Sequence, residues 1–239
     1  MQYRPALQSA LLLRRYKRFL ADVETASGAV LTLHCPNTGS MRGCTPEGAT
    51  AWYSTSARPG RKYPHTLEQV ETPAGERIGV HTGRANALVA EALDAGLVPE
   101  LADYSDRRSE VKVGPNRVDF VLSGASGIGD CHLEVKSVTL AAGDGLGLFP
   151  DAVSERARRH LEALAERARS GQPAALVYCV QHTGIQRVAP ADRIDAGYGH
   201  ALRAAMAAGV MVLAWQAELS PVEARLVRPL PVLAEQPWG

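Results

Sequence analysis

The pattern of apolar residues changes near residue 82, and this change limits the chain to a two-part architecture. Before it, short apolar runs alternate with turn residues such as Ser27-Gly28 and Ala74-Gly75. These runs predict five short strands, at residues 19–25, 30–34, 49–56, 67–72 and 77–81. Five short strands in about 80 residues are typical of a small OB-type barrel, although a generic five-stranded sheet fits the pattern nearly as well.

After residue 82 the pattern alternates between helix and strand. Strands are predicted at residues 110–113, 117–122, 132–138, 175–181 and 210–216. Helices are predicted at 84–95, 150–169 and 201–208, each followed by a glycine or proline stop. The middle helix, opened by Pro150 and capped by Asp151, would carry one apolar face made of Val153, Ala157, Leu161, Leu164 and Ala168. This order predicts an α/β layer architecture, so we divide the chain into two domains, residues 1–82 and 83–239.

Cysteine usage and the lack of long apolar runs favour a cytoplasmic protein without membrane association. No apolar run approaches the ~18 residues of a spanning helix, and Leu11–Leu13 is too short for a signal peptide core. The four cysteines, Cys35, Cys44, Cys131 and Cys179, form no C-x-x-C pair and are expected to be reduced and mostly buried. Cys35 and Cys44 with His34 fit no zinc spacing.

Charge is nearly balanced overall but uneven along the chain. The formal net charge of +1 argues against a simple polybasic nucleic-acid binder. Residues 1–82 nevertheless hold 10 Lys and Arg against 6 Asp and Glu. Their excess is clustered, and local clusters attract phosphates even on a neutral chain. The candidate nucleic-acid-binding residues are Arg14, Arg15, Lys17, Arg18, Arg58, Arg61 and Lys62, together with Arg156 and Arg159 on the long helix. A solvated charged face is the alternative interpretation.

The stretch from Asn116 to Thr139 carries the strongest chemical signal. Asp119 lies within one predicted strand, and Glu134 and Lys136 point to one face of the next. If the two strands pair, two carboxylates and one ammonium meet on an otherwise apolar sheet. Adjacent carboxylates repel one another, and oxygen ligands favour Mg²⁺ or Mn²⁺, which activates water towards a phosphodiester. An exposed Asp–Lys–Glu ion cluster is the alternative, because this spacing occurs readily by chance.

Two further acids are candidates for the same site. Glu91, on the helix before these strands, is a candidate ligand of a second metal ion or a candidate support for the residues that bind the first. Asp151 is a candidate ligand or a plain helix cap. Neither a phosphate-binding G-x-x-x-x-G-K-[ST] loop nor a G-x-S-x-G nucleophile motif occurs, which disfavours nucleotide hydrolysis by the first and serine hydrolase chemistry by the second.

Longer motifs resemble the sugar fermentation stimulation protein A (SfsA) family. They agree in order and interval over nearly the whole chain: RYKRFLADV at 15–23, HCPNTGSMRGC at 34–44, RKYPHT at 61–66, EVKSVTL at 134–140 and FPDAVSERARRHL at 149–161. The resemblance implies a cytosolic bacterial or archaeal protein that binds DNA non-specifically, with a link to maltose metabolism behind the family name. It further implies an OB-like barrel followed by a PD-(D/E)xK restriction-endonuclease-like α/β domain.

On that implied domain, Asp119, Glu134 and Lys136 fall on the nuclease motif, and Glu91 falls on its acidic helix position. The chain reads SERA at 154–157 where many relatives read TERG, and Asn116 replaces the more usual Ser; neither change touches a proposed ligand. A helix-turn-helix is also ascribed to the family's C-terminal region, here about residues 202–221. Gly209 followed by VMVLAW favours a buried strand there instead.

Two functions remain open at this point. In the first, the protein is a Mg²⁺- or Mn²⁺-dependent nuclease with catalytic residues Asp119, Glu134, Lys136 and Glu91. Its metal ligands are Asp119 and Glu134, and Tyr16, Phe19 and Tyr63 are candidates for stacking on single-stranded bases. In the second, it is a DNA-binding regulator with an inactive nuclease-like fold. DNA is the expected partner, single-stranded or branched forms included; RNA and a homodimer are left open. Sugar chemistry rests on the family name alone, because no separate carboxylate pair suits a glycosidase.

Overall fold

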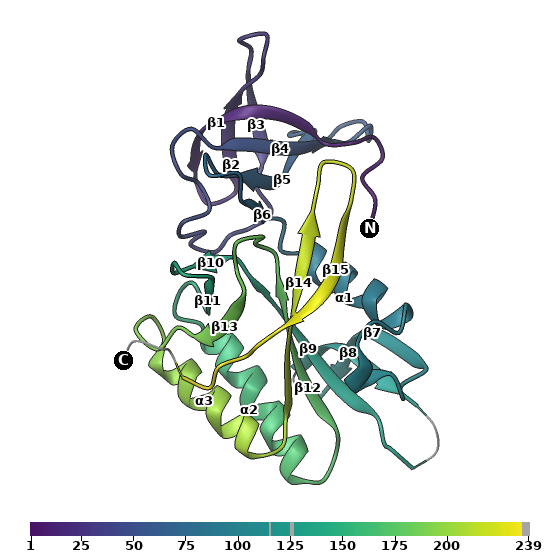
Figure 1. Cartoon of the computed structure of the whole chain (residues 1–239). Helices are drawn as coiled ribbons and strands as arrows, with labels where there is room; N and C mark the ends of the chain where they lie inside the picture. The colour runs from purple at the N-terminus through teal and green to yellow at the C-terminus, as the bar shows by residue number, and fades with distance from the viewer. Residues whose placement is uncertain (115, 125–126, 236–239) are drawn as a thin grey trace.

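A computed structural model describes residues 1–114, 116–124 and 127–235 of the 239-residue chain. Figure 1 shows a β-barrel above an α/β domain. The barrel strands are β1 (Gln8–Tyr16), β2 (Leu20–Glu24), β3 (Val30–His34), β4 (Thr50–Thr55) and β5 (His65–Glu71). They pair in the order β3-β2-β1-β4-β5, and β3 also pairs with β5, which closes the barrel. The closed barrel confirms the OB-type arrangement over an open sheet. A short strand, β6 (Arg77–Gly79), pairs antiparallel with β5.

Strand β1 is a barrel strand that sequence periodicity did not predict. It pairs with β4 through its first half and with β2 through its second, and a bulge between Leu12 and Arg14 joins the two halves. A bulge bends a strand and interrupts the alternation of its side chains. Ala10 and Leu12 face the core, whereas Leu11 and Leu13 are exposed, so the run Leu11–Leu13 reads as apolar although only Leu12 is buried.

The second domain is a six-stranded sheet with helices on both faces. Its strands are β7 (Asp106–Val113), β8 (Asn116–Ser123), β9 (Cys131–Val138), β12 (Ala174–Val180), β14 (Met211–Leu219) and β15 (Ala224–Leu230). The order is β15-β14-β12-β9-β8-β7, with β12 parallel to both of its neighbours. Every residue of β12 is buried, as expected for a central parallel strand covered on both faces.

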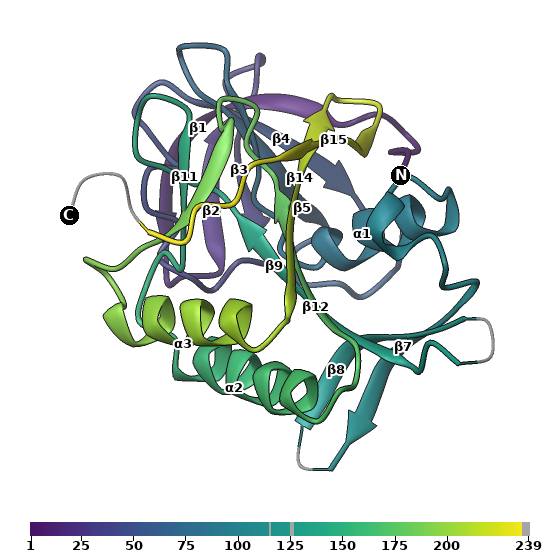
Figure 2. The same ribbon diagram turned by 60° about the horizontal axis from the view of Figure 1, so that its bottom comes forward.

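The helices cover opposite faces of this sheet. Helix α1 (Arg84–Asp94) packs on one face, and helices α2 (Glu155–Arg169) and α3 (Ala196–Ala207) lie side by side on the other (Figure 2). A small second sheet contains β10 (Leu140–Ala141), β11 (Leu146–Phe149) and β13 (Arg187–Pro190). A 3₁₀ turn (Pro99–Leu101) follows α1. These short elements were not predicted, because two to four residues carry no readable period.

The start of α2 differs from the sequence prediction. The helix begins at Glu155, and its cap is Ser154, whose hydroxyl accepts the N–H of Ala157 at 3.2 Å. Val153 is 72% exposed and does not join the apolar face. Asp151 therefore does not cap α2; its carboxylate contacts the barrel instead. Serine is as good a cap as aspartate, so the cap preference alone could not distinguish them.

The C-terminal region contains a strand where a helix-turn-helix is ascribed to the family. Helix α3 begins at Ala196, earlier than the predicted residue 201, because Asp195 caps it by accepting the N–H of Tyr198 at 2.9 Å. The helix ends at Ala207, and β14 follows Gly209 as a buried strand parallel to β12. Within the described residues, no helix is long and apolar enough to cross a membrane. Cys35, Cys44, Cys131 and Cys179 are all buried and carry free thiols.

The two domains are joined by contacts on both sides of the linker. The hairpin of β14 and β15 reaches up to the N-terminal segment (Figure 1), where Ala224 N–H bonds to the Met1 carbonyl and Leu7 N–H to the Pro221 carbonyl. Gly79 N–H bonds to the Gln181 carbonyl at 2.8 Å. These bonds fix the position of the barrel relative to the sheet that carries the candidate site.

Candidate functional site

The site forms where strands β8 and β9 diverge. Their ladder pairs residues 120–122 with residues 131–133. One residue further along, the side chain of Asp119 accepts the backbone N–H of Val135 through Oδ2 at 2.8 Å. The carboxylate thus takes the place of a strand carbonyl as the acceptor for β9. A backbone N–H left unsatisfied in a buried sheet is costly, so Asp119 is part of the local fold as well as a candidate ligand.

Helix α1 supplies the second contact to Asp119. Asn86 Nδ2 donates to Asp119 Oδ1 at 3.0 Å. Burial raises the pKa of Asp119, and the negative charge of nearby Glu134 raises it further, while the Val135 N–H, Asn86 and Lys136 oppose the rise. Phe120 pairs with Leu133, so one further step along the two strands brings Asp119 opposite Glu134, whose charge acts on it.

Glu134 is a buried carboxylate held by two cationic or proton-donating side chains. It is 5% exposed. Lys136 Nζ bonds its Oε1 at 2.5 Å, and His160 Nδ1, from helix α2, contacts the same oxygen. Burial by itself would raise the pKa of Glu134, but His160 and Lys136 outweigh it, so the pKa is lowered and the carboxylate is ionised. None of the described residues bonds to Oε2, which leaves that oxygen open to a ligand.

Two cavities flank this group of residues. A pocket of about 170 Å³ between α2 and β8 is lined by Glu134, His160, His132 and Arg117. A cleft of about 310 Å³ between the two domains is lined by Lys136 and Asn86 on one side and by the barrel loop at Asn37–Gly39 on the other. Asp119 is not in the lining of either cavity. The site therefore lies between the two openings, with Lys136 facing the larger one.

Glu91 lies outside this site, contrary to the sequence prediction. Its side chain is 52% exposed and pairs with the N-terminal amine of Met1. Glu91 follows Asn86 by five residues, which turns it about 140° around the helix from the face that meets Asp119. Asn86 takes the position on α1 for which Glu91 was predicted. An amide indicates a metal or catalytic site less strongly than a carboxylate does. The sequence analysis therefore selected Glu91 on this helix and not Asn86.

His160 is a further residue of this site that was not among the predicted site residues. It lies three residues after Ala157 and four before Leu164, both buried against the sheet, so it borders the apolar face of α2. That spacing was the available signal, because a polar residue at the edge of a buried helix face points towards the covered sheet. Its neighbours Arg156 and Arg159 are exposed on the outer face of the same helix.

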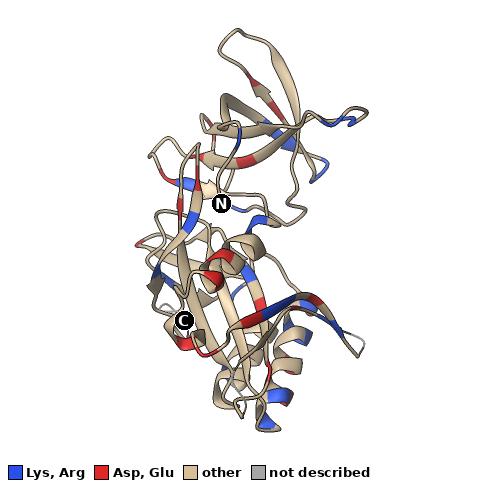
Figure 3. Cartoon of the chain, turned by 90° about the vertical axis from the view of Figure 1, so that its right-hand side faces the viewer, with Lys and Arg blue, Asp and Glu red and all other residues tan. Residues whose placement is uncertain are grey.

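The basic residues of the barrel fall into two groups. Arg15 is used internally: its guanidinium donates to the carbonyls of Arg18, Asn37 and Gly39 at 2.7–2.9 Å. Arg14 pairs with Asp22 at 2.8 Å and lies over the Tyr16 ring. The remainder are exposed and keep their charge towards solvent: Lys17, Arg18, Arg58, Arg61 and Lys62. Figure 3 shows blue segments on the barrel loops and on the α/β domain.

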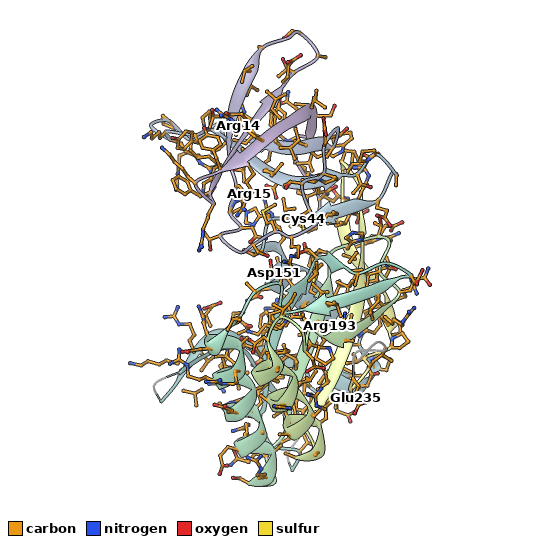
Figure 4. All side chains as sticks on the ribbon, turned by 90° about the vertical axis from the view of Figure 1, so that its left-hand side faces the viewer. Arg14, Arg15, Cys44, Asp151, Arg193 and Glu235 are labelled. Atoms are coloured by element: carbon orange, nitrogen blue, oxygen red, sulfur yellow. The ribbon has the colours of Figure 1, made fainter. Side chains whose placement is uncertain are left out.

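Asp151 holds the barrel against the α/β domain. Its Oδ2 accepts from the Ser40 hydroxyl at 2.8 Å and from the Met41 N–H at 3.0 Å. Figure 4 shows Arg15 and Cys44 on the barrel above and Asp151 below them. Cys35 and Cys44 belong to the barrel core beside this contact. No group of three or more His, Cys, Asp and Glu side chains arranged for a metal occurs in the part of the chain that the structure describes.

Together, the fold and the site define a two-domain protein in which an OB barrel precedes a restriction-endonuclease-like α/β domain carrying a D…E-x-K set. The comparisons with known proteins agree over both domains. The model of the SfsA N-terminal OB domain matches residues 13–80, and the model of the sugar fermentation stimulation protein RE domain matches residues 83–223. The chain belongs to the sugar fermentation stimulation protein (SfsA) family.

Individual relatives are similar over most of their length. A sugar fermentation stimulation protein homolog from Halorhodospira halophila is 58% identical over 217 residues, covering 90% of each chain. One from Hahella chejuensis is 54% identical, covering 92% of each. Among solved structures, Pyrococcus furiosus SfsA in complex with Ca²⁺ matches with a TM-score of 0.86 at 25% identity, covering 98% of each chain. The predicted family and fold class are thereby confirmed.

Proposed function

We propose that this protein is a divalent-metal-dependent nuclease that binds DNA without sequence specificity and hydrolyses phosphodiester bonds. The observation that supports the proposal is the position of Asp119 at the fork of β8 and β9: it accepts the N–H of Val135, the residue after Glu134, and Lys136 bonds to Glu134. The description of the Pyrococcus furiosus relative as a Ca²⁺ complex supports a divalent cation in this family.

The donor set fits a hard divalent cation such as Mg²⁺ or Mn²⁺. Asp119 and Glu134 offer carboxylate oxygens, the ligands that such cations prefer. The pKa of Asp119 is raised in part by the charge of Glu134, a repulsion that a cation between them relieves. When bound, the cation would lower the pKa of a coordinated water and offset the charge of the phosphodiester.

The remaining residues hold the two carboxylates in place or offset the charge of the phosphate. Lys136 lines the cleft, so its ammonium is placed to offset charge that develops on the phosphate oxygens. His160, on helix α2, holds the carboxylate of Glu134 through its contact with Oε1. Asn86 holds Asp119. The exposed basic residues of the barrel and of α2 would bind the phosphate backbone without reading base sequence.

Cleavage of labelled nucleic acids tests this proposal. The wild type and three variants are incubated with single-stranded, duplex and branched DNA and with RNA, with Mg²⁺, Mn²⁺ or EDTA. We expect metal-dependent cleavage that falls about a hundredfold or more in Glu134→Gln and Lys136→Ala. Glu91→Gln is the matched control, because Glu91 lies outside the site. Intact substrates after incubation with the wild type would overturn the proposal, as would equal cleavage by Glu134→Gln.

A DNA-binding regulator with an inactive nuclease-like fold is the second candidate. It is favoured by the double contact on Glu134 Oε1, since Lys136 and His160 already satisfy that oxygen without a metal. This candidate predicts no Mn²⁺ binding at Glu134 and unchanged DNA affinity in Asp119→Asn. The nuclease predicts the opposite for metal binding.

A further inference from the structure

We propose that the cleft between the two domains takes one unpaired nucleotide, which makes a single strand the substrate of the site and excludes an intact duplex from it. This inference rests on the proposed function, because Lys136 belongs to both the cleft and the catalytic group. It goes further by naming the form of nucleic acid that reaches the site.

The cleft has a fixed roof and a deep floor. Its roof is the barrel loop Asn37–Gly39, and its floor contains Asn86 and Lys136. The side chain of Lys136 is 14% exposed and that of Glu134 is 6% exposed. A phosphate must therefore enter the cleft to reach Lys136, which lines it, and Glu134 lies behind Lys136 in the adjoining pocket. At about 310 Å³ the cleft lies at the lower end of the range for small-ligand sites, which suits one nucleotide.

The roof is held by two charged side chains, so a duplex cannot displace it at low cost. Arg15 donates to the carbonyls of Asn37 and Gly39. Asp151 accepts from Ser40 and from the Met41 N–H. A Cβ on Gly39 would lie 2.9 Å from Asn37 Oδ1 and 3.4 Å from Asp151 Oδ2. The turn therefore has little room for a side chain larger than the hydrogen of glycine. Enzymes that reach an atom inside such a pocket take the nucleotide out of the duplex or act on single strands.

The cleft offers both a charged group for a phosphate and an apolar wall for a base, which are the two parts of a nucleotide. Both Lys136 and Asp151 line the cleft, and the lysine would attract a phosphate whereas the aspartate would repel it. Phe149 forms part of the wall and is held by the rings of Tyr178 and Tyr198, with centroids 5.8 and 5.1 Å away. A base has a flat apolar face that such a wall accommodates.

A buried amide provides a further polar contact. Asn37 is 7% exposed and lines the cleft. Its Oδ1 accepts the Gly39 N–H at 2.8 Å, while none of the described residues accepts from its Nδ2. Asn37 Nδ2 is not itself a buried atom, so a base carbonyl or sugar oxygen in the cleft would accept from it. An inorganic phosphate would fill only the Lys136 end and would leave this donor unpaired.

Fluorescence anisotropy without metal tests the inference while the substrate stays intact. The probes are a 5′-fluorescein oligothymidylate and a blunt duplex of the same length, and the variant is Thr38→Trp, which fills the mouth of the cleft from an exposed position. Val30→Trp, 61% exposed on β3, is the matched control. Thr38→Glu is a second variant that adds a repelling charge in place of bulk.

We expect the wild type and Val30→Trp to bind the single strand about tenfold more tightly than the duplex, and both Thr38 variants to lose about tenfold for the single strand only. Equal affinity for the two probes, or an equal loss for both in the Thr38 variants, would overturn the inference. The proposed function fails separately: a wild type that cuts nothing in Mn²⁺ contradicts the nuclease but leaves this binding test unaffected.

Discussion

The carboxylate of Asp119 accepts the backbone N–H of Val135 at 2.8 Å, so a side chain joins the two strands at the point where their ladder ends. The residue that the nuclease proposal needs as a ligand is thus also a structural acceptor. Its two roles can be separated, because an amide keeps the acceptor and loses the charge, whereas a methyl group loses both.

Asp119→Ala should destabilise the protein by about 1–3 kcal/mol, because the Val135 N–H and the Asn86 amide lose their acceptor in a buried sheet. Asp119→Asn should cost less, since its Oδ1 can still accept from Val135. Urea unfolding followed by circular dichroism measures both. Equal stability of the alanine and wild-type proteins would mean that the fork is held by other contacts.

Removal of His160 should shift the pH dependence of cleavage. His160 is the largest favourable contribution that lowers the pKa of Glu134, so His160→Ala should raise that pKa and move the acidic limb of the pH–rate profile to higher pH. His160→Gln retains a donor and should shift the limb less. Glu162→Gln, on the exposed face of α2, should leave it in place. A loss of rate with an unshifted limb would argue for a purely structural His160.

Folding stability should fall below neutral pH because of His182. Burial lowers the pKa of this side chain from 6.5, and its Nδ1 accepts the Gly184 N–H, which requires an unprotonated nitrogen. A folded state that disfavours the proton loses stability as the pH falls below 6.5 towards the lowered folded pKa. His182→Asn can keep the acceptor without titrating. Urea midpoints at pH 7.5 and 5.5 should therefore differ less in the variant; identical differences would exclude this residue as the cause.

Cutting the tie between the domains should loosen the roof of the cleft. In Asp151→Asn the Met41 N–H loses a charged acceptor, and such bonds are about twice as strong as neutral ones. Hydrogen exchange followed by mass spectrometry should show faster exchange at residues 37–41. Asp103→Asn, exposed on the far domain, serves as the control. Unchanged exchange in Asp151→Asn would mean that Arg15 alone holds the loop.

Charge removal on the barrel should reduce DNA affinity most where the basic side chain has no acidic partner. Lys17 and Arg18 are exposed, so the double variant Lys17→Gln, Arg18→Gln should weaken binding at low salt and lower the slope of log K against log salt by about 1–2. Arg14→Gln should have a smaller effect, because Asp22 already offsets that charge. Equal slopes in all three proteins would place the phosphate contacts elsewhere.

Sequence reasoning recovered the parts of this structure that follow from repeated local patterns. Strand Val30–His34 matches its predicted bounds, and helix α1 matches to within one residue, because each carries its own period and stop signals. Strand β1 was missed because its bulge breaks the alternation. The start of α2 was placed too early because Pro150-Asp151 has the residue types of a helix start. The actual N-cap is Ser154.

The candidate site was predicted in part for a similar reason. Asp119, Glu134 and Lys136 lie on strands that pair, and continuing the register by one residue brings Asp119 opposite Glu134. Asn86 and His160 reach the site from opposite faces of the sheet, and only the packing of α1 and α2 brings them there. Arg15 was chosen for its charge, but its contacts with backbone carbonyls are not apparent from the sequence.

Titration with Mn²⁺ tests the central claim most directly, since it asks whether Asp119 and Glu134 form one cation site. Isothermal calorimetry of the wild type, Asp119→Asn, Glu134→Gln and Glu91→Gln would give the stoichiometry and affinity of each. We predict Mn²⁺ binding by the wild type and Glu91→Gln, and a loss of at least about tenfold in affinity in the other two variants. Equal affinity in all four proteins, or no binding by the wild type, would contradict the claim.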